Sequence, residues 1–116
     1  MKKLFQFLKF DWQAFAKDKK FLALGTRIWK DHDTGKVLGT IVDCVIWEDN
    51  TAYKQNDGES VSNKFEKIAF KVPRTMTVPK DSLIEPANVV AKVWGDFRNQ
   101  LSCTADDVKV VGQKKV

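Results

Sequence analysis

The chain has 116 residues, which is enough for one hydrophobic core and too few for two domains. Hydrophobic residues make up 43% of the chain and charged residues 30%, the balance of a folded globular protein, and no apolar run is long enough to cross a bilayer. This composition excludes a disordered chain and a membrane-spanning helix.

The net charge of +5 is unevenly spread along the chain. Residues 1–20 carry six lysines against two aspartates, and residues 64–116 carry ten cations against six acids. Residues 21–63 carry four cations against seven acids, so the middle is acidic and both ends are basic. Because a basic chain is attracted to polyanions, this charge favours a nucleic-acid partner without excluding other partners.

The first predicted element is an amphipathic helix over residues 2–19, within an N-terminal unit of residues 1–20. The segment begins like a signal peptide, but Lys9 and Asp11 interrupt its apolar run and no small-residue cleavage site follows, so we expect a cytoplasmic protein. We expect the helix to pack on the domain's own sheet, with a partner interface or a membrane-surface anchor as alternatives. Its apolar stripe at helical spacing comprises Leu4, Phe5, Leu8, Trp12, Phe15 and Ala16.

Beyond residue 20, β-branched and aromatic residues predict strands. Residues 21–30 and 37–49 are expected to form a long hairpin around a turn at residues 31–36. Gly25 and Gly39 lie inside its arms, where sharp coiling or a close backbone approach would require glycine. Such bent strands suit a small closed barrel.

The rest of the chain predicts a polar loop, a third strand, a proline-rich connector, a closing hairpin and a frayed tail. The connector holds all three prolines, so at most a single helical turn is expected in it, at residues 80–84. The closing hairpin is expected to have a tight turn at Asn99 and Gln100 and a break near residues 105–107. In chain order these elements cover residues 50–63, 64–72, 73–86, 89–98 with 101–111, and 112–116.

The predicted fold is mainly β, with one domain over residues 21–111 that follows the N-terminal helix. Five short, coiled strands, arranged as a three-strand meander, a longer connection and a final hairpin, match the OB fold, a five-stranded Greek-key barrel. Another small barrel of the SH3 type is the alternative.

Three runs of sequence resemble the single-stranded-DNA-binding OB-fold proteins, in particular the small divergent versions carried by phages and by conjugative elements of Gram-positive bacteria. The resemblance covers roughly residues 22–111, and its closing hairpin is VWGDF followed by LSCTADDV. It implies a role in replication, recombination or conjugative transfer. One departure is the proline-rich connector, because familiar members usually place a helix between strands three and four. The runs are GTRIWKDHDTGKVLGTIVDCVIWED, NKFEKIAFKV and AKVWGDFRNQLSCTADDVKVV.

The sequence offers little for catalysis. His32 is the single histidine, which excludes a histidine-based triad or a multi-histidine metal site within one chain, and there is no phosphate-cradling glycine loop. The acids around His32 and at residues 48–49 are read as turn caps and solvated strand ends rather than as a metal site. Cys44 and Cys103 are expected to be buried free thiols. We therefore predict a protein that is not an enzyme and holds no metal or cofactor.

Aromatic and basic residues alternate on several of the predicted strands. Binding sites for single-stranded nucleic acid combine stacking platforms for the bases with cations for the phosphates, so this pattern predicts such a site. Trp94 is the clearest case, because it stands between Lys92 and Arg98 on the wet face of its strand. The predicted nucleic-acid-binding residues are Arg27, Trp29, Trp47, Tyr53, Lys54, Phe65, Lys67, Lys71, Lys92, Trp94 and Arg98.

The strand register decides which of these aromatics face outward, and one sequence does not reveal it. Trp12 is expected in the core or in the packing of the helix, Trp29 and Trp94 are expected on the surface, and Trp47 is left open. The alternatives are that the N-terminal helix covers Trp94, or that the barrel or the helix is a protein-interaction module that joins replication or transfer proteins or a second copy. RNA stays possible as the ligand, whereas duplex binding lacks a recognition helix.

Overall fold

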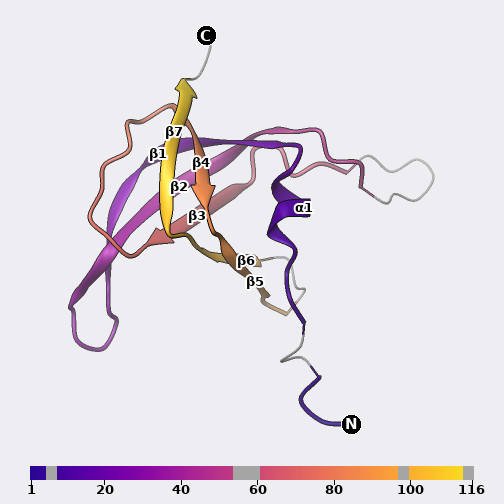
Figure 1. The fold of residues 1–116 in the computed structure, drawn as a ribbon, viewed down its shortest axis with the longest axis horizontal. Helices are drawn as coiled ribbons and strands as arrows, with labels where there is room; N and C mark the ends of the chain where they lie inside the picture. The colour runs from indigo at the N-terminus through magenta and orange to yellow at the C-terminus, as the bar shows by residue number, and fades with distance from the viewer. Residues whose placement is uncertain (5–7, 54–60, 97–99, 114–116) are drawn as a thin grey trace.

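The computed structural model describes residues 1–4, 8–53, 61–96 and 100–113. These residues form one seven-stranded sheet and one short helix (Figure 1). Strands hold more than half of the described residues, so the prediction of a mainly β chain is confirmed. The elements are α1 (Trp12–Ala16), β1 (Lys19–Lys30), β2 (Val37–Asp49), β3 (Lys67–Val72), β4 (Ser82–Ala87), β5 (Val90–Trp94), β6 (Gln100–Thr104) and β7 (Asp107–Gln113).

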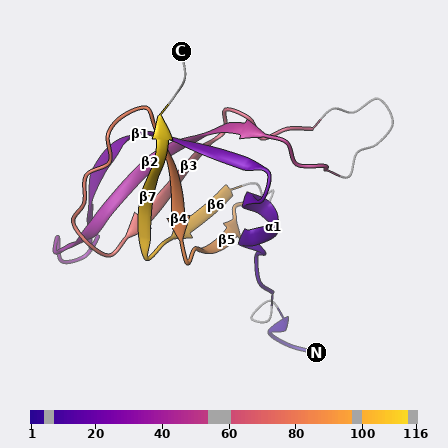
Figure 2. The ribbon, with the colours of Figure 1, turned by 45° about the horizontal axis from the view of Figure 1, so that its top comes forward.

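The strand order in the sheet is β5-β6-β3-β2-β1-β4-β7. Neighbouring strands are antiparallel except for β3 and β6, which are parallel. Figures 1 and 2 both show β4 and β7 lying across the long strands β1 and β2, so the sheet curls over on itself. The core lies inside this curl.

The predicted five-stranded OB-like Greek-key barrel is not what the described residues show, because they form a single sheet of seven strands and not a closed five-strand barrel. After β3, the described residues make four strands where two were expected. Asn88, whose φ of 52° lies in the left-handed region, separates β4 from β5, and residues 105–106 separate β6 from β7, where a break was predicted.

Strand β4 lies inside the predicted proline-rich connector, so the expected helical turn at residues 80–84 is wrong. Pro86 is part of β4 and pairs with Val108 of β7. Among the described residues, β1 pairs with β4 only at Leu83 and Ile84. The opposite side of β4 is therefore unpaired at Pro86, and an edge position tolerates a residue that has no N–H group to donate.

The predicted hairpin of β1 and β2 is confirmed, including its turn at residues 31–36. Asp31 holds this turn, since its side chain accepts hydrogen bonds from the amides of Asp33 and Thr34, and its backbone pairs with Gly35 and Lys36. Three register shifts coil the arms.

Gly39 of β2 meets the predicted need for a close backbone approach. A Cβ atom at this position would lie 1.9 Å from the carbonyl oxygen of Val72 and 2.8 Å from the amide nitrogen of Arg74. No side chain fits there, so glycine at position 39 lets the end of β3 cross close to β2.

The hydrophobic core follows the two-residue period of the strands. Alternate residues of β2 and β3 are buried, and the residues between them are partly exposed. Both cysteines belong to the core, as predicted, and neither forms a disulfide. The buried cluster comprises Phe21, Ala23, Val42, Cys44, Ile46, Ile68, Phe70, Val72, Val78, Ile84, Ala91, Cys103 and Val108.

The predicted N-terminal helix of residues 2–19 is wrong in extent, because α1 has five residues. Asp11, which the helix pattern treats as an interior residue, is instead the N-cap and accepts a hydrogen bond from the amide of Ala14. Lys19 already belongs to β1, where it pairs with Asp49. Residues 5–7 of the predicted helix lie outside the described residues.

Trp12 explains why α1 stays on the sheet. Its ring stacks on Phe21 at 5.6 Å and meets Phe70 edge-on at 5.5 Å, and both of these partners are core residues. The prediction that Trp12 packs on the core is therefore confirmed.

The C-terminal boundaries differ slightly from the prediction. Gln100 is the first residue of β6 rather than part of a tight turn, and Asn99 lies outside the described residues. β7 continues to Gln113, two residues past the expected end of the last strand. Within the described ranges, no helix has the length and hydrophobicity that a membrane crossing needs.

Candidate nucleic-acid interface

The strand register places outward-facing residues of five strands in one row. Arg27 of β1 pairs with Ile41 of β2, which pairs with Lys71 of β3. Lys71 pairs with Thr104 of β6, and Thr104 pairs with Val90 of β5. Because cross-strand partners point to the same side of a sheet, the five side chains share a surface that we call the outer face.

The outer face carries several of the predicted residues. Neighbours at two-residue spacing share the same side of a strand, which adds Trp29 on β1, Lys67 on β3, and Lys92 and Trp94 on β5. The buried alternation on β2 and β3 agrees with this assignment, because the residues between the outward positions are core residues. The register thus brings Arg27, Trp29, Lys67, Lys71, Lys92 and Trp94 to one side of the sheet.

Trp29 and Lys71 form the first aromatic and basic pair on this face. The Lys71 Nζ atom lies 5.6 Å from the centroid of the Trp29 ring, within cation–π range. Trp29 is half-buried and Lys71 is partly exposed. A base that stacks on the indole would therefore have an ammonium group beside it for its phosphate.

Among the predicted cations that the structure describes, Arg27 is the one paired with an acid on the outer face. Its Nε atom lies 2.6 Å from Asp43 Oδ2, and its Nη2 atom lies 2.9 Å from Asp43 Oδ1. This two-point hydrogen bond raises the pKa of Arg27 above its ordinary value, with the charge of Asp43 acting in the same direction. The sequence analysis missed Asp43, although its spacing from Ile41 places it on the same side of β2.

Trp94 is exposed, with 58% of its surface accessible, so the alternative that the N-terminal helix covers it is wrong. It pairs with Gln100 of β6, and Lys92 pairs with Ser102. The parallel pairing of β3 with β6 joins Phe70 to Cys103 and Lys71 to Thr104. Trp94 is thus a second platform, with Lys92 two residues before it on the same side of β5.

Trp47 and Phe65 form a separate aromatic pair near the far end of β2. Their ring centroids lie 6.0 Å apart, and the Lys64 Nζ atom lies 4.9 Å from the Phe65 centroid. Trp47 is eight residues from Gly39, the partner of Trp29, which corresponds to about 26 Å along a strand. The pair is therefore a third aromatic site, apart from the Trp29 platform. The prediction missed Lys64.

Tyr53 follows β2, and its hydroxyl is bound to the fully shielded carboxylate of Asp49. It donates a 2.7 Å hydrogen bond to Asp49 Oδ2, and it accepts one of 2.8 Å from Asn63 Nδ2. The hydroxyl therefore has a structural role, and the ring is partly exposed. Lys54 and Arg98, the remaining predicted residues, lie outside the described residues.

Lys19 and Asp49 form the centre of this buried cluster, and both side chains are fully shielded from solvent. The Lys19 Nζ atom lies 3.4 Å from Asp49 Oδ1 and donates hydrogen bonds of 2.8 Å to the Phe15 carbonyl and the Thr51 hydroxyl. The cluster consists of Lys19, Asp49, Thr51, Tyr53 and Asn63, and it ties the start of β1 to both ends of the loop after β2.

The pKa of Asp49 reflects competing effects of burial and hydrogen bonding. Burial favours the neutral acid and acts to raise the pKa. Hydrogen bonds from the Asn63 amide, the Tyr53 hydroxyl and Thr51 favour the carboxylate and outweigh it. The pKa therefore lies well below its ordinary value, and the carboxylate stays ionised opposite Lys19.

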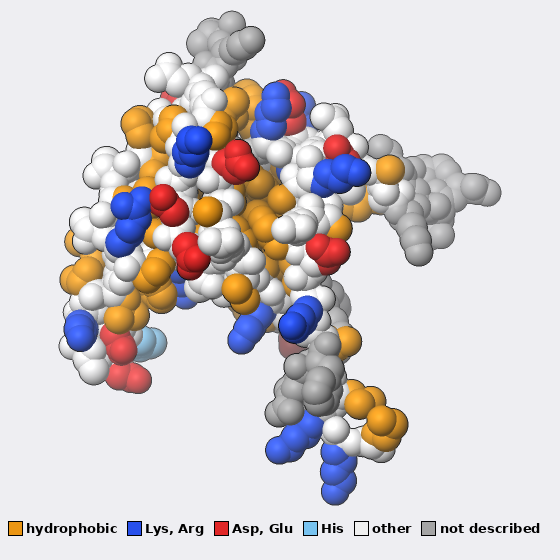
Figure 3. Space-filling model, viewed as in Figure 1, with side chains coloured by type: hydrophobic (Ala, Val, Ile, Leu, Met, Phe, Trp, Pro, Cys, Tyr) orange, Lys and Arg blue, Asp and Glu red, His pale blue; other side chains and the backbone are white. Residues whose placement is uncertain are grey.

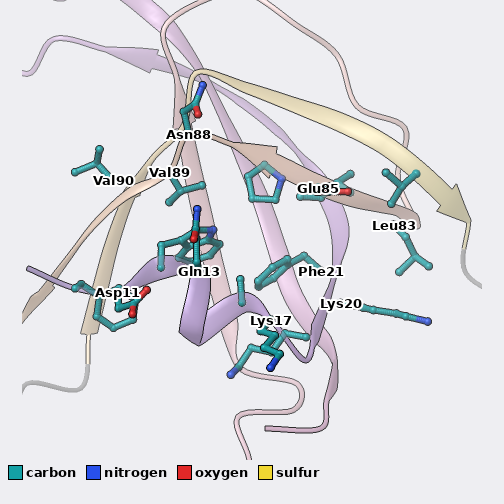
Figure 4. A pocket seen from close by; sticks show the side chains of 17 residues that line it. Asp11, Gln13, Lys17, Lys20, Phe21, Leu83, Glu85, Asn88, Val89 and Val90 are labelled. Carbon is teal, nitrogen blue, oxygen red and sulfur yellow. The ribbon is translucent and has the colours of Figure 1, made fainter.

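A groove of about 1060 Å³ lies between α1, the start of β1 and the corner between β4 and β5, and of the residues named on the outer face it includes only Val90. Figure 3 shows hydrophobic side chains gathered in this region, and Figure 4 shows side chains of these elements lining it, Phe21 and Val89 among them. None of the predicted nucleic-acid-binding residues lines the groove.

The described part of the chain offers few groups that could bind a metal ion or act as a nucleophile. It contains no group of three or more histidine, cysteine or acidic residues arranged to hold a metal ion. Cys44 and Cys103 are buried, and burial raises the pKa of each thiol to about 12. Both are neutral at physiological pH and far less nucleophilic than an exposed thiolate.

No protein-family model, curated protein or solved structure matches the chain.

Proposed function

We propose that the protein is a non-enzymatic, sequence-tolerant single-stranded-DNA-binding protein of replication, recombination or conjugative transfer. The observation that carries the proposal is the outer face, where two tryptophans and three lysines from β1, β3 and β5 share one side of the sheet. Tryptophan rings can stack on bases of any sequence, and lysines can follow the phosphate chain. Each stacked base contributes about 1–3 kcal/mol, so a few platforms give useful affinity.

We also propose that the curled sheet is an OB-like arrangement. When β4 with β5 and β6 with β7 are taken as the halves of two bent strands, the chain has five strands. Each of these then has two neighbours, through the pairs of β1 with β2 and β4, β3 with β2 and β6, and β5 with β6. In OB folds, the face of the second and third strands and the loops beside it bind oligonucleotides, and β2 and β3 are central to the outer face.

Tryptophan fluorescence tests the proposed function. Adding oligo-dT at low salt is expected to quench the emission, because the exposed Trp94 and the half-buried Trp29 would stack on bases. The affinity is expected to fall steeply as salt rises, since phosphate contacts release counterions. Single-stranded RNA and duplex DNA, titrated in parallel, show which nucleic acid binds best. Unchanged fluorescence and no binding by anisotropy at low salt would remove the proposal.

Self-association through the groove is the second candidate function, and the groove of about 1060 Å³ is the observation that favours it. Val111 lines this groove and is 54% exposed. Sedimentation velocity over a concentration series detects a dimer. If Val111→Asp abolishes the dimer without changing the circular dichroism spectrum, the groove is the interface, whereas a monomer at every concentration rejects self-association.

A further inference from the structure

We propose that Asp43 competes with nucleic-acid phosphates for Arg27, and so weakens the attraction of the outer face for polyanions. This inference rests on the proposed function. It assigns to Asp43 a role in ligand selection. Contacts with phosphates then contribute less to the binding free energy, and base stacking contributes a larger share of it.

The geometry of the pair supports this role. A guanidinium group presents parallel N–H donors that match a carboxylate or a phosphate equally well. In the structure these donors are occupied, because Nε and Nη2 of Arg27 each bond one oxygen of Asp43. Asp43 therefore occupies the position that a phosphate would need.

The surroundings of the pair make the acid unusual. Asp43 pairs with Ala69 of β3, whose neighbours at two-residue spacing are Lys67 and Lys71, so the acid stands level with a position between two outward lysines. The pair is accessible to a ligand, since the side chains of Arg27 and Asp43 are 61% and 34% exposed. An incoming phosphate must displace Asp43 and then lie beside a negative charge.

Removing the carboxylate has a calculable effect. In Asp43→Asn, Arg27 is free to contact one phosphate. Each added contact steepens the dependence of log K on log salt by about 0.9 for duplex DNA and about 0.7 for single strands. At 0.1 M salt this corresponds to a gain in affinity of about eightfold for duplex and about fivefold for single strands, and the gain disappears near 1 M salt.

The test uses the full chain and three polyanions: oligo-dT, a DNA duplex and inorganic polyphosphate, which has no bases. Asp43→Asn is compared with Asp107→Asn, which changes the net charge equally and breaks the exposed Arg74–Asp107 pair, whose acid lies on β7 at the other end of the sheet order from β5. The double variant Arg27→Gln/Asp43→Asn shows whether the gain depends on Arg27. The inference predicts tighter binding of all three polyanions by Asp43→Asn alone, with a steeper salt slope.

The outcomes separate this inference from the proposed function. If wild-type protein binds oligo-dT but Asp43→Asn binds no more tightly than Asp107→Asn, the competition is wrong and the proposed function stands. Weaker binding of oligonucleotides by Asp43→Asn would also overturn it, because Asp43 would then contact bases. If wild-type protein binds no oligo-dT while Asp43→Asn gains polyphosphate affinity through Arg27, the proposed function fails and the competition for Arg27 holds.

Discussion

Asp49→Asn is predicted to be strongly destabilising, because it removes the negative partner of a fully shielded lysine. Lys19 keeps its charge but loses the carboxylate at 3.4 Å. In the wild type, the Tyr53 hydroxyl and the Asn63 amide both donate hydrogen bonds to the Asp49 carboxylate. Asparagine replaces one of the two carboxylate oxygens by an NH₂ group, which cannot accept a hydrogen bond. Breaking a buried ion pair by removing one partner costs about 3–5 kcal/mol, a large part of the stability of a domain of this size.

The assay is urea unfolding followed by circular dichroism, with Glu48→Gln as the matched control. Glu48 is the neighbouring acid on β2, and its pair with Lys20 is exposed, so its loss is expected to cost less than about 1 kcal/mol. If Asp49→Asn does not fold, Tyr53→Phe removes the hydrogen bond to the carboxylate, together with the one that the hydroxyl accepts from Asn63, and is expected to cost about 1.5–3 kcal/mol. Equal stabilities of Asp49→Asn and Glu48→Gln would refute the account of the cluster.

The same variant gives a pH dependence whose sign follows from the lowered pKa of Asp49. A carboxylate with a folded pKa below its unfolded value of about 3.9 contributes stability that is fully present above that pH and is lost as pH falls below it. The difference in unfolding free energy between wild type and Asp49→Asn is therefore expected to be constant near neutral pH and to narrow below about pH 4. A difference that stays constant to pH 2 would contradict this assignment.

Two further predictions concern the core. Gly39→Ala is expected to lower the unfolding free energy by more than about 2 kcal/mol, because its Cβ would overlap the Val72 carbonyl, whereas Gly112→Ala, with 3.7 Å to the nearest atom, is the control in urea unfolding. Cys44 and Cys103 are expected to resist a thiol reagent at pH 8 until urea unfolds the chain, since both are buried with a pKa of about 12. Rapid labelling of the native protein would show that the core opens readily.

The hairpin of β1 and β2 could be predicted because its signals are local. Two-residue alternation defines both arms, and Asp31 and Gly35 supply turn chemistry between them. Trp12 could also be placed in the core from its spacing alone. Such features are determined by the spacing of residues close together in the sequence, so the sequence pattern is enough to predict them.

Features that depend on distant pairing could not be predicted. The N-terminal pattern is helical as far as Lys19, but pairing of Lys19 with Asp49 draws that residue into β1. Strand β4 was missed because a proline such as Pro86 argues against a strand. Pro86 is tolerated in β4 because it lies beyond the residues that pair with β1, where no neighbouring strand needs its missing N–H group. In both cases tertiary pairing outweighs the local preference.

The candidate site shows the same division. Alternation identified Trp29, Lys71 and Trp94 as outward residues, but which of them share a surface depends on register, which a single sequence does not contain. Tyr53 is an aromatic residue of the kind that stacks on bases, but its hydroxyl is bonded to Asp49, the last residue of β2. One sequence does not reveal this contact. The pairing of Arg27 with Asp43 likewise follows from the register of β1 and β2.

The most direct measurement of the central claim is the affinity for oligo-dT of variants at the two platforms of the outer face. Trp29→Ala and Trp94→Ala are each expected to weaken binding by about 1–3 kcal/mol, measured by fluorescence anisotropy of a labelled oligonucleotide at 50 mM salt. Val111→Ala, an exposed apolar residue on β7, is expected to leave the affinity unchanged. Wild-type affinity in both tryptophan variants, with their fold intact, would contradict the claim that bases stack on this face.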